Sequence, residues 1–456
     1  MHTFKKGMNL PISGEPEQAI HPASFPTHVA LIAADHHGMK PSFRVRAGDS
    51  VKRGQILFED KKTPGVYFTA PGAGTVSAIN RGERRAFQSA VIALSPGERS
   101  GAPAADEFQT FENYTGKDPE TLKRDQVAGL LIESGLWTAL RTRPFSRTPQ
   151  IDAIPSSIFV TAVDTHPLAP NMDVVAAGRE ADMGAGLVVL SKLVPKVYFC
   201  KAKGSRLQAS AASGAINEEF AGPHPSGTVG LHIHTLDPVS AKKSVWHVGL
   251  QDVLAIGRLF RTGQLDVDRV VALGGPSALK PRLLRTRLGV ALGTLTDGEL
   301  KEGENRIVSG SVLAGRASQG EAHGYLGRFH QQITVLREGR EREFLGWLSL
   351  GAEKFSLLNI YISKFNPEKK FNFTTTTNGS HRAMVPIGLY EKVMPMDILP
   401  TYLLRSLAVG DLERAEELGC LELDEEDLGL CSFVCPGKSD YGTILRYNLT
   451  TIEKEG

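Results

Sequence analysis

Short apolar runs separated by glycine and proline make up most of the first 100 residues. Each run holds four to six mainly apolar residues and ends at or near a turn-forming residue. Runs of this length between turns predict β-strands rather than helices. The expected strands are 29–33, 42–45, 56–59, 66–69, 74–79 and 90–94.

Two glycine-bearing phrases in this region, 45–57 and 69–76, resemble the two turns of lipoyl and biotinyl carrier domains. Glycine permits positive φ at tight turns, and the Val and Ile positions beside it face a core. We therefore expect a barrel-sandwich hybrid domain over 1–100. A carrier domain would bear a modified lysine at a hairpin tip, where Lys61 and Lys62 stand. The following Thr-Pro-Gly lengthens this tip, so ordinary surface lysines are the simpler interpretation.

The pattern changes at residue 119, where apolar residues recur with helical spacing. A helix is expected over 119–133, with Val127, Leu130 and Leu131 on one face. Strands are expected at 157–163, 174–177 and 196–200, alternating with helical segments. Such alternation is typical of an α/β domain, here 101–260.

The rest of the chain divides into two further parts. Residues 261–335 offer a strand at 269–273, a helical segment at 281–288 and a strand at 306–312, an order compatible with a β-grasp domain of the SLBB type. Residues 336–456 carry helical patterns such as 411–418 and 441–454. The expected fold is therefore a multidomain α+β chain that ends in a mostly helical region.

Composition and charge narrow the function classes. The 456 residues include 52 Lys and Arg against 50 Asp and Glu, a balance that argues against a nucleic-acid-binding surface. No run of 18 apolar residues predicts a membrane span, and the first residues have no apolar stretch of a signal peptide. Four cysteines are too few for a disulfide framework, which favours a reducing compartment.

Several chemical motifs are incomplete. Cys431 and Cys435 have the spacing of the end of a ferredoxin run but lack its earlier cysteines, so buried structural thiols are expected. His232 and His234 alternate on an expected strand and could begin a zinc site, although structural histidines are favoured. The acidic run 424–427 is interpreted as a solvated face near a helix start rather than a cation site.

The segment 132–145 resembles the glycine-rich flavin loop of the flavin-bearing subunit of respiratory complex I. In that family, glycines let the backbone approach the FMN phosphate. Here Trp137, Thr138 and Leu140 occupy the glycine-rich stretch, and their side chains would fill the space that the flavin needs. The resemblance therefore implies that the scaffold is kept and the FMN site is lost.

Over its whole length the sequence resembles the A subunits of bacterial Na⁺-translocating NADH:quinone oxidoreductases, and more distantly the C subunit of the Rnf complex. The Rnf subunit carries ferredoxin clusters, which this chain lacks by sequence. The phrases that carry the main resemblance are 54–62, 133–145, 309–313, 325–330, 336–340, 374–380, 384–388, 422–427 and 431–438.

This resemblance implies a peripheral subunit on the cytoplasmic face of the bacterial inner membrane. The six-subunit complex oxidises NADH, reduces ubiquinone and exports Na⁺. The resemblance implies that NADH, flavins and iron–sulfur centres belong to other subunits, and that this chain has no catalytic residue, cofactor or metal of its own. Its partners would be ubiquinone and the membrane subunits, especially the large hydrophobic B subunit, with no nucleic acid.

Ubiquinone would need an apolar slot with donors to its two carbonyl oxygens. Two segments supply candidate residues. The first contains His36, His37 and Met39, and the second, in the altered flavin loop, contains Trp137, Arg141, Arg143 and Phe145. Ion pairs made by Arg141 and Arg143 within the protein are an equally good interpretation. Two other function classes remain open, a stand-alone flavoenzyme that oxidises NADH and a lipoyl-type carrier.

Overall fold

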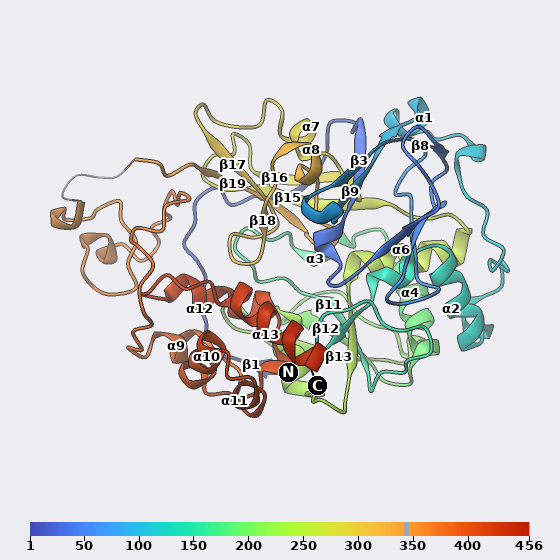
Figure 1. Cartoon of the computed structure of the whole chain (residues 1–456). Coiled ribbons are helices and arrows are strands. Elements are labelled where there is room, and N and C mark those ends of the chain that lie inside the picture. Colours follow the sequence, from blue (N-terminus) through green and yellow to red (C-terminus); the bar gives the residue numbers. More distant parts are fainter. Residues whose placement is uncertain (342–345, 456) are drawn as a thin grey trace.

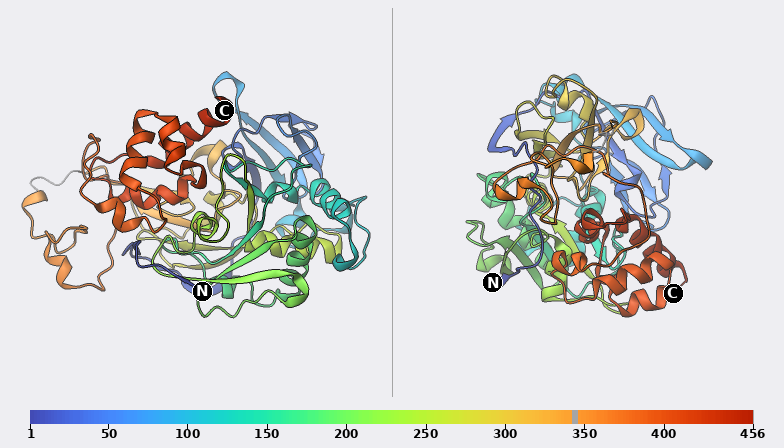
Figure 2. Two further views of the ribbon diagram at one scale, coloured as in Figure 1. Left: turned by 90° about the horizontal axis from the view of Figure 1, so that it is seen from below. Right: turned by 90° about the vertical axis from the view of Figure 1, so that its left-hand side faces the viewer.

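The computed structural model describes residues 1–341 and 346–455 and arranges four structural units around a common centre (Figure 1). The N-terminal β unit, the α/β unit and the third sheet lie against one another, and the C-terminal helices lie beside the α/β unit, next to α5 (Val229–Leu236) (Figure 2). Within the described ranges, no helix is both long and apolar enough to cross a bilayer.

The N-terminal unit consists of two small antiparallel sheets. One has the order β3-β9-β8-β5 and the other the order β4-β6-β7. Phe58 and Phe68 stack at 4.7 Å inside the unit, where they join Val29, Val76 and Ile92 in a buried apolar cluster. Each of the six strands expected from sequence is present. They are β3 (His28–Ile32), β4 (Pro41–Phe43), β6 (Ile56–Asp60), β7 (Tyr67–Thr69), β8 (Gly74–Arg81) and β9 (Phe87–Leu94), and the short β5 (Ser50–Val51) is an additional strand that was not expected.

The α/β unit has a six-stranded sheet in the order β1-β13-β12-β11-β14-β10. All neighbouring strands are parallel except the edge strand β10, which is antiparallel to β14. The strands are β1 (His2–Thr3), β10 (Arg141–Arg143), β11 (Ile158–Ala162), β12 (Val197–Ala202), β13 (Ala215–Ala221) and β14 (Val245–Gly249).

Helices cover both faces of this sheet, because successive strand residues point to opposite sides and present apolar side chains on each. Val160 and Phe199 pack with α4 (Glu180–Leu193) and α6 (Leu250–Thr262), while Phe159 and Cys200 pack with α5 (Val229–Leu236). The other helices of this unit are α2 (Arg124–Glu133) and α3 (Met172–Val175), whereas α1 (Pro96–Arg99) lies beside β8 of the N-terminal unit (Figure 1). The expected α2 face of Val127, Leu130 and Leu131 is buried.

The third unit has the strand order β18-β17-β19-β15-β16-β2, with β15 and β19 parallel at its centre. A hairpin, a short helix and a returning parallel strand give the β-grasp arrangement expected from sequence. The elements are β2 (Glu17–Pro22), β15 (Asp268–Gly274), β16 (Arg282–Arg287), α7 (Leu292–Thr296), β17 (Asn305–Ser309), β18 (Arg316–Ala317), α8 (Gly320–His323) and β19 (Gln332–Arg337).

The C-terminal helices share one apolar core that includes Tyr390, Leu404 and Leu445. The expected helices at 411–418 and 441–454 are present. The helices are α9 (Leu389–Val393), α10 (Pro400–Val409), α11 (Leu412–Glu417), α12 (Gly429–Val434) and α13 (Tyr441–Glu455). Before them, residues 346–388 contain the short 3-10 helices η7 (Gly346–Leu348) and η8 (Ile362–Phe365), and single β-bridges join Phe371 to Ile12 and Thr374 to Arg337.

Three local predictions were wrong. Residues 174–177, expected as a strand, lie at the end of α3 and just beyond it, and residues 281–288, expected as helical, contain strand β16. The expected strand carrying His232 and His234 is helix α5. Two residues apart on a helix, the two imidazoles point in different directions, so they do not form a metal-binding pair.

Candidate functional site

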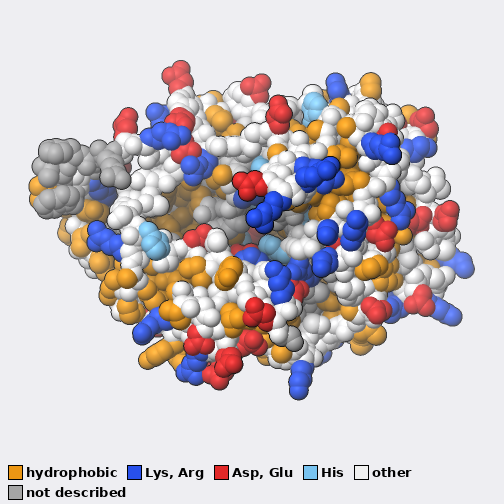
Figure 3. Space-filling view, in the orientation of Figure 1, with side chains coloured by type: hydrophobic (Ala, Val, Ile, Leu, Met, Phe, Trp, Pro, Cys, Tyr) orange, Lys and Arg blue, Asp and Glu red, His pale blue; other side chains and the backbone are white. Residues whose placement is uncertain are grey.

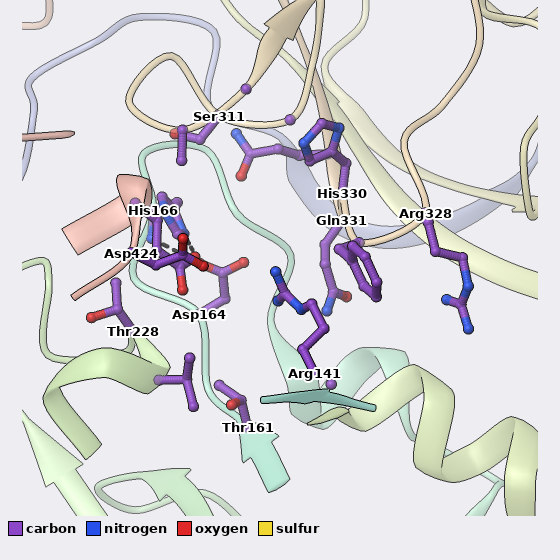
Figure 4. A pocket seen from close by; sticks show the side chains of 18 of the residues that line it. Arg141, Thr161, Asp164, His166, Thr228, Ser311, Arg328, His330, Gln331 and Asp424 are labelled. Carbon is purple, nitrogen blue, oxygen red and sulfur yellow. Dashed lines mark hydrogen bonds and ion pairs between the residues drawn. The ribbon is translucent and has the colours of Figure 1, made fainter. Parts of the chain in front are cut away.

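A cavity of about 440 Å³ lies where the four units meet (Figures 3 and 4). Its wall includes residues of every unit, so no single unit forms it alone. In Figure 3 the molecule is hollowed near the middle of the face shown, with Lys and Arg side chains around the opening. The main lining side chains are Asp35, His37, Arg141, Thr161, Asp164, His166, Thr228, His247, Arg316, Phe329, His330, Gln331, Asp424 and Glu425.

The cavity sits at the carboxyl ends of the parallel strands β11 and β14. From β11 the chain continues to β12 and β13 on one side, and then returns to β14 on the other side. This reversal of direction opens a crevice between adjacent strands, which is the usual ligand site of open α/β sheets. The floor of the cavity is lined by Thr161 near the end of β11, by Asp164 just after it and by Gly249 at the end of β14.

Arg141 projects into the cavity from the edge strand β10, where its backbone pairs with that of His247 (Figure 4). Its guanidinium carbon lies 4.2 Å from the centre of the Phe329 ring. Among the described residues, Arg141 has no hydrogen-bond or ion-pair partner for its side chain. Burial lowers the pKa of Arg141, but a guanidinium stays charged in proteins. Arg141 therefore brings to the cavity a positive charge whose donors are all free among the described residues.

Two adjacent histidines of the N-terminal unit lie beside this arginine. His37 lines the cavity, with its Nε2 3.6 Å from Glu425 Oε1. His36 is buried next to it, edge-on to Phe68 at 4.7 Å and near Phe329 at 5.6 Å. Burial lowers the pKa of His36 to about 3 and that of His37 to about 4. Both imidazoles are therefore neutral at pH 7, and each has a single N–H to donate.

The third unit contributes His330, which reasoning from sequence missed. Its Nδ1 lies 2.8 Å from Ser309 Oγ, and burial lowers its pKa to about 4. Nearby, Arg316 pairs with Asp35 at 2.5 Å, and Arg328 pairs with Asp252 at 2.8 Å. The sequence held a signal for this site, because His330 ends the phrase 325–330 that carries part of the family resemblance.

Asp164 and His166 form a second missed pair, directly after β11. Asp164 Oδ1 lies 2.8 Å from His166 Nδ1, and its charge raises the pKa of His166 against the effect of burial. Nε2 of His166 is buried without a partner among the described residues. Polar residues after a strand expected in a parallel sheet were the available sequence signal.

The acidic run 424–427 is not a solvated face, so this prediction was wrong. Asp424 and Asp427 are buried, and the run forms a cluster with two arginines that are distant in sequence. Arg143 lies 3.0 Å from Asp427 and 3.3 Å from Asp424, and Arg446 lies 2.5 Å from Asp424. Carboxylates buried this deeply need counter-charges, and these arginines provide them.

The cluster has more carboxylates than guanidinium groups, and the pKa values reflect this excess. Burial and the charge of Asp424 raise the pKa of Glu425 to about 7, and burial raises that of Asp427 to about 6. His37, Asp424 and Glu425 bring possible cation ligands within 4.8 Å of one another. Both carboxylates already bind Arg446, so this arrangement is an ion-pair network at the cavity rim.

The seven candidate residues separate into two groups. His37 and Arg141 line the cavity, and His36 lies behind its wall. The other four have structural contacts. Trp137 is completely buried and donates from Nε1 to the Pro149 carbonyl at 2.9 Å, and Arg143 is held by the acidic cluster. Phe145 packs on the C-terminal helical core, and Met39 packs on the main core.

The remaining sequence motifs lie away from the cavity. Cys431 and Cys435 are buried free thiols in the C-terminal core, as expected for structural thiols. His234 bonds Glu422 at 2.8 Å, while His232 lies 3.1 Å from the Ser226 carbonyl oxygen. Lys61 and Lys62 are exposed after β6. None of these residues is among the described residues that line the cavity.

Comparison with known proteins gives consistent matches over the whole chain. Three family models match in order, the NqrA N-terminal barrel-sandwich hybrid domain over 2–95, the NqrA second alpha/beta domain over 122–265 and the NQRA C-terminal domain over 270–320. Similar proteins that carry the name of the A subunit of Na⁺-translocating NADH-quinone reductase occur in Hahella chejuensis, at 57% identity over 457 residues, and in Pseudomonas aeruginosa PAO1, at 56% over 456. Each alignment covers 100% of both chains.

Proposed function

Because the chain belongs to the family of Na⁺-translocating NADH-quinone reductase A subunits, we propose that it is a redox-inactive peripheral subunit whose central cavity receives the head group of ubiquinone. The reaction belongs to the whole complex, in which this chain is one of several subunits. We place the chain at the cytoplasmic face of the inner membrane, on the membrane subunits of the complex, including the large hydrophobic B subunit.

The observation that carries the quinone proposal is the free guanidinium of Arg141 over the Phe329 ring, 4.2 Å away. A quinone head is a flat ring with two carbonyl acceptors. Arg141 offers charged donors to one carbonyl oxygen, and neutral His37 can donate to such an oxygen at the rim. Phe329, Val163, Met172 and Val229 supply apolar surface in the same cavity. A mixed wall of this kind suits a small polar ring.

The proposal of a redox-inactive chain rests on the segment 135–145. Trp137 and Leu140 have no exposed surface, and Thr138 is also buried, so side chains fill the inside of this segment. Gly135 has φ of +79°, and a Cβ there would lie 2.4 Å from Thr69 Oγ1. The segment is thus packed tightly between the α/β and N-terminal units, which leaves little room for an isoalloxazine ring beside it.

The test uses the assembled complex with Arg141→Gln. This change removes the charged donor but keeps most of the side-chain volume. A hydrogen bond to a charged group contributes about 1.5–3 kcal/mol, so KM for a short-chain ubiquinone should rise about tenfold or more, while KM for NADH stays constant. The exposed Arg258→Gln on α6 serves as the matched control.

An unchanged quinone KM in Arg141→Gln would refute a quinone head at this position. Crosslinking by a photoreactive ubiquinone analogue gives an independent measurement, and we expect labelled peptides from 141–147 and 325–332. A flavin absorbance spectrum retained by the purified chain would instead support the flavoenzyme alternative.

A further inference from the structure

A projecting segment outside the cavity exposes an unusual number of large apolar side chains. It lies between the third sheet and the C-terminal helices, and it extends from one side of the molecule in Figure 1 and in the left view of Figure 2. We call residues 348–365 the finger. Its exposed apolar residues are Leu348, Leu350, Leu358, Ile360, Ile362 and Phe365.

The degree of exposure is high even for surface residues. Leu350 is 74% exposed, Ile360 63% and Phe365 90%. Single exposed apolar residues are normal, but a contiguous group marks a surface that another molecule covers. Six such residues within 18 positions form a group of this kind.

The finger is nonetheless held in a defined shape by its own contacts. Tyr361 packs on Gly351, where an added Cβ would lie 2.1 Å from the Tyr361 ring. Ser363 Oγ donates to the Lys354 carbonyl at 2.6 Å, and Ile362 N donates to the Leu350 carbonyl at 3.0 Å. Phe355 anchors the base through rings of Phe371 and Phe373, both 5.5 Å away. The exposed apolar side chains therefore belong to an ordered projection.

We propose that the finger inserts into an apolar groove with an acidic rim on another subunit of the same complex. This inference rests on the proposed role as a docked subunit, but it does not depend on the quinone site. The chain bends at 357–359 and enters η8 at Ile362, and this bent tip leaves Leu358, Ile360 and Ile362 exposed as apolar contacts for such a groove.

The excess of positive charge in and beside the finger indicates that the rim of the partner's groove is acidic. Residues 346–371 hold four lysines against two glutamates. Lys369 pairs with Glu353, whereas Lys364 is exposed beside the apolar residues and, within the described ranges, has no ion-pair partner. A carboxylate on the partner would match this charge, and rim charges of this type steer association.

A protein groove fits the finger better than a lipid surface does. Between η7 and η8 the finger is irregular, so many of its backbone N–H and C=O groups have no partner in a helix or sheet. The hydrocarbon region of a bilayer cannot satisfy such groups, whereas a protein groove or water can.

The test compares two triple variants of the full chain within the complex. Leu350→Ser/Ile360→Ser/Phe365→Ser removes apolar contacts from the finger. Leu279→Ser/Val409→Ser/Tyr447→Ser changes exposed apolar residues elsewhere and is the control. With an affinity tag on another subunit, we expect recovery of the finger variant to fall at least tenfold and the control to match the unmodified chain. Lys364→Glu should reduce recovery further as ionic strength falls.

Full recovery of the finger variant would overturn the proposal. Vesicles of phosphatidylethanolamine and phosphatidylglycerol without protein provide the second arm. Flotation of the unmodified chain with them, lost in the finger variant, would assign the finger to lipid instead and would also overturn the groove. The quinone proposal fails separately, because Arg141→Gln should alter quinone KM without altering recovery.

Discussion

Trp137 determines what the segment 135–145 can accommodate. Its ring meets Trp246 edge-on at 5.4 Å, and its N–H is satisfied by the Pro149 carbonyl. An indole with both its apolar faces and its donor satisfied belongs to the core. The residue that the sequence offered as a possible quinone contact therefore supports the strand that carries Arg141.

Replacing Trp137 by Ala should lower the free energy of unfolding by about 3–5 kcal/mol, because a fully buried aromatic ring would leave a cavity. Urea denaturation of the isolated chain measures this loss. Tyr447→Ala, which removes a ring that is 73% exposed, should change stability by less than about 0.5 kcal/mol. Equal effects of the two changes would contradict the assignment of Trp137 to the core.

The sequence could indicate Arg141 and Arg143 as candidates but could not separate them. Two residues apart on a strand, their side chains share one face. Only the fold shows that Arg143 meets Asp427, 284 positions later, while Arg141 keeps its donors free in the cavity. Long-range ion pairs leave no local pattern, so their partners could not be inferred from spacing.

At the scale of elements, the 3-10 helix η10 (Glu425–Leu428) attaches the C-terminal helices to the edge strand β10. Arg143 is the bridge, because it is fully buried and bonds both Asp427 Oδ2 and the Glu422 carbonyl. Burial lowers the pKa of Arg143, but the nearby carboxylates of Asp424 and Asp427 raise it by more. Arg143 therefore stays charged at every accessible pH. The attachment thus depends on the charge state of the acids alone.

Arg143→Met should destabilise the chain by about 3–5 kcal/mol, because it leaves buried carboxylates without their counter-charge. The pKa of Asp427, raised by burial to about 6, gives the direction with pH. A carboxyl group whose pKa is raised in the folded state makes the protein less stable as the pH rises. The loss of stability caused by Arg143→Met should therefore be smaller at pH 5 than at pH 8. Thermal unfolding at both pH values measures it, with the exposed Arg46→Met as control. A cost that is equal at both pH values would contradict this account.

Whether a segment is a helix or a strand could be predicted where one of its faces is polar. The prediction was less successful where both faces are buried against other elements. The strands of the N-terminal unit followed from their turns. Residues 281–288 were expected to be helical, but they contain strand β16. Its adjacent Leu283 and Leu284 do not alternate with polar residues, because they belong to different cores on opposite faces of the sheet. Helix α5 has only eight residues, too few for its period to exceed the chance alternation of His232, Ile233 and His234.

At the scale of the whole molecule, Glu98 connects separate units. Its carboxylate bonds Arg53 in the N-terminal unit at 2.9 Å and Arg287 of β16 at 2.8 Å. It also accepts from the backbone N–H of Ala73 at 2.8 Å. Although burial opposes ionisation, the two arginines lower the pKa of Glu98 to about 2.

Glu98→Gln should cost about 3–5 kcal/mol at pH 7, because Arg287 would remain buried without its partner. In the wild type, the stabilisation by the Glu98 carboxylate is complete above the ordinary pKa of 4.5 and is lost as the pH falls toward 2. The free energies of unfolding of the two proteins should therefore converge in acid. Chemical denaturation between pH 3 and pH 7 tests this convergence. The exposed Glu83→Gln should follow the wild type throughout, and a gap that widens in acid would refute the role of the carboxylate.

The placement of the first 22 residues has a consequence for how the chain reaches this structure. Strand β1 pairs with β13, where His2 faces Phe220, and strand β2 pairs with β16, where His21 faces Leu284. Both pairings must wait for sequence made much later. At about 5–20 residues per second, the first strand is exposed for roughly 10–40 s during synthesis. The N-terminus is therefore among the last parts of the α/β sheet to close, and a fusion there would delay the completion of the fold.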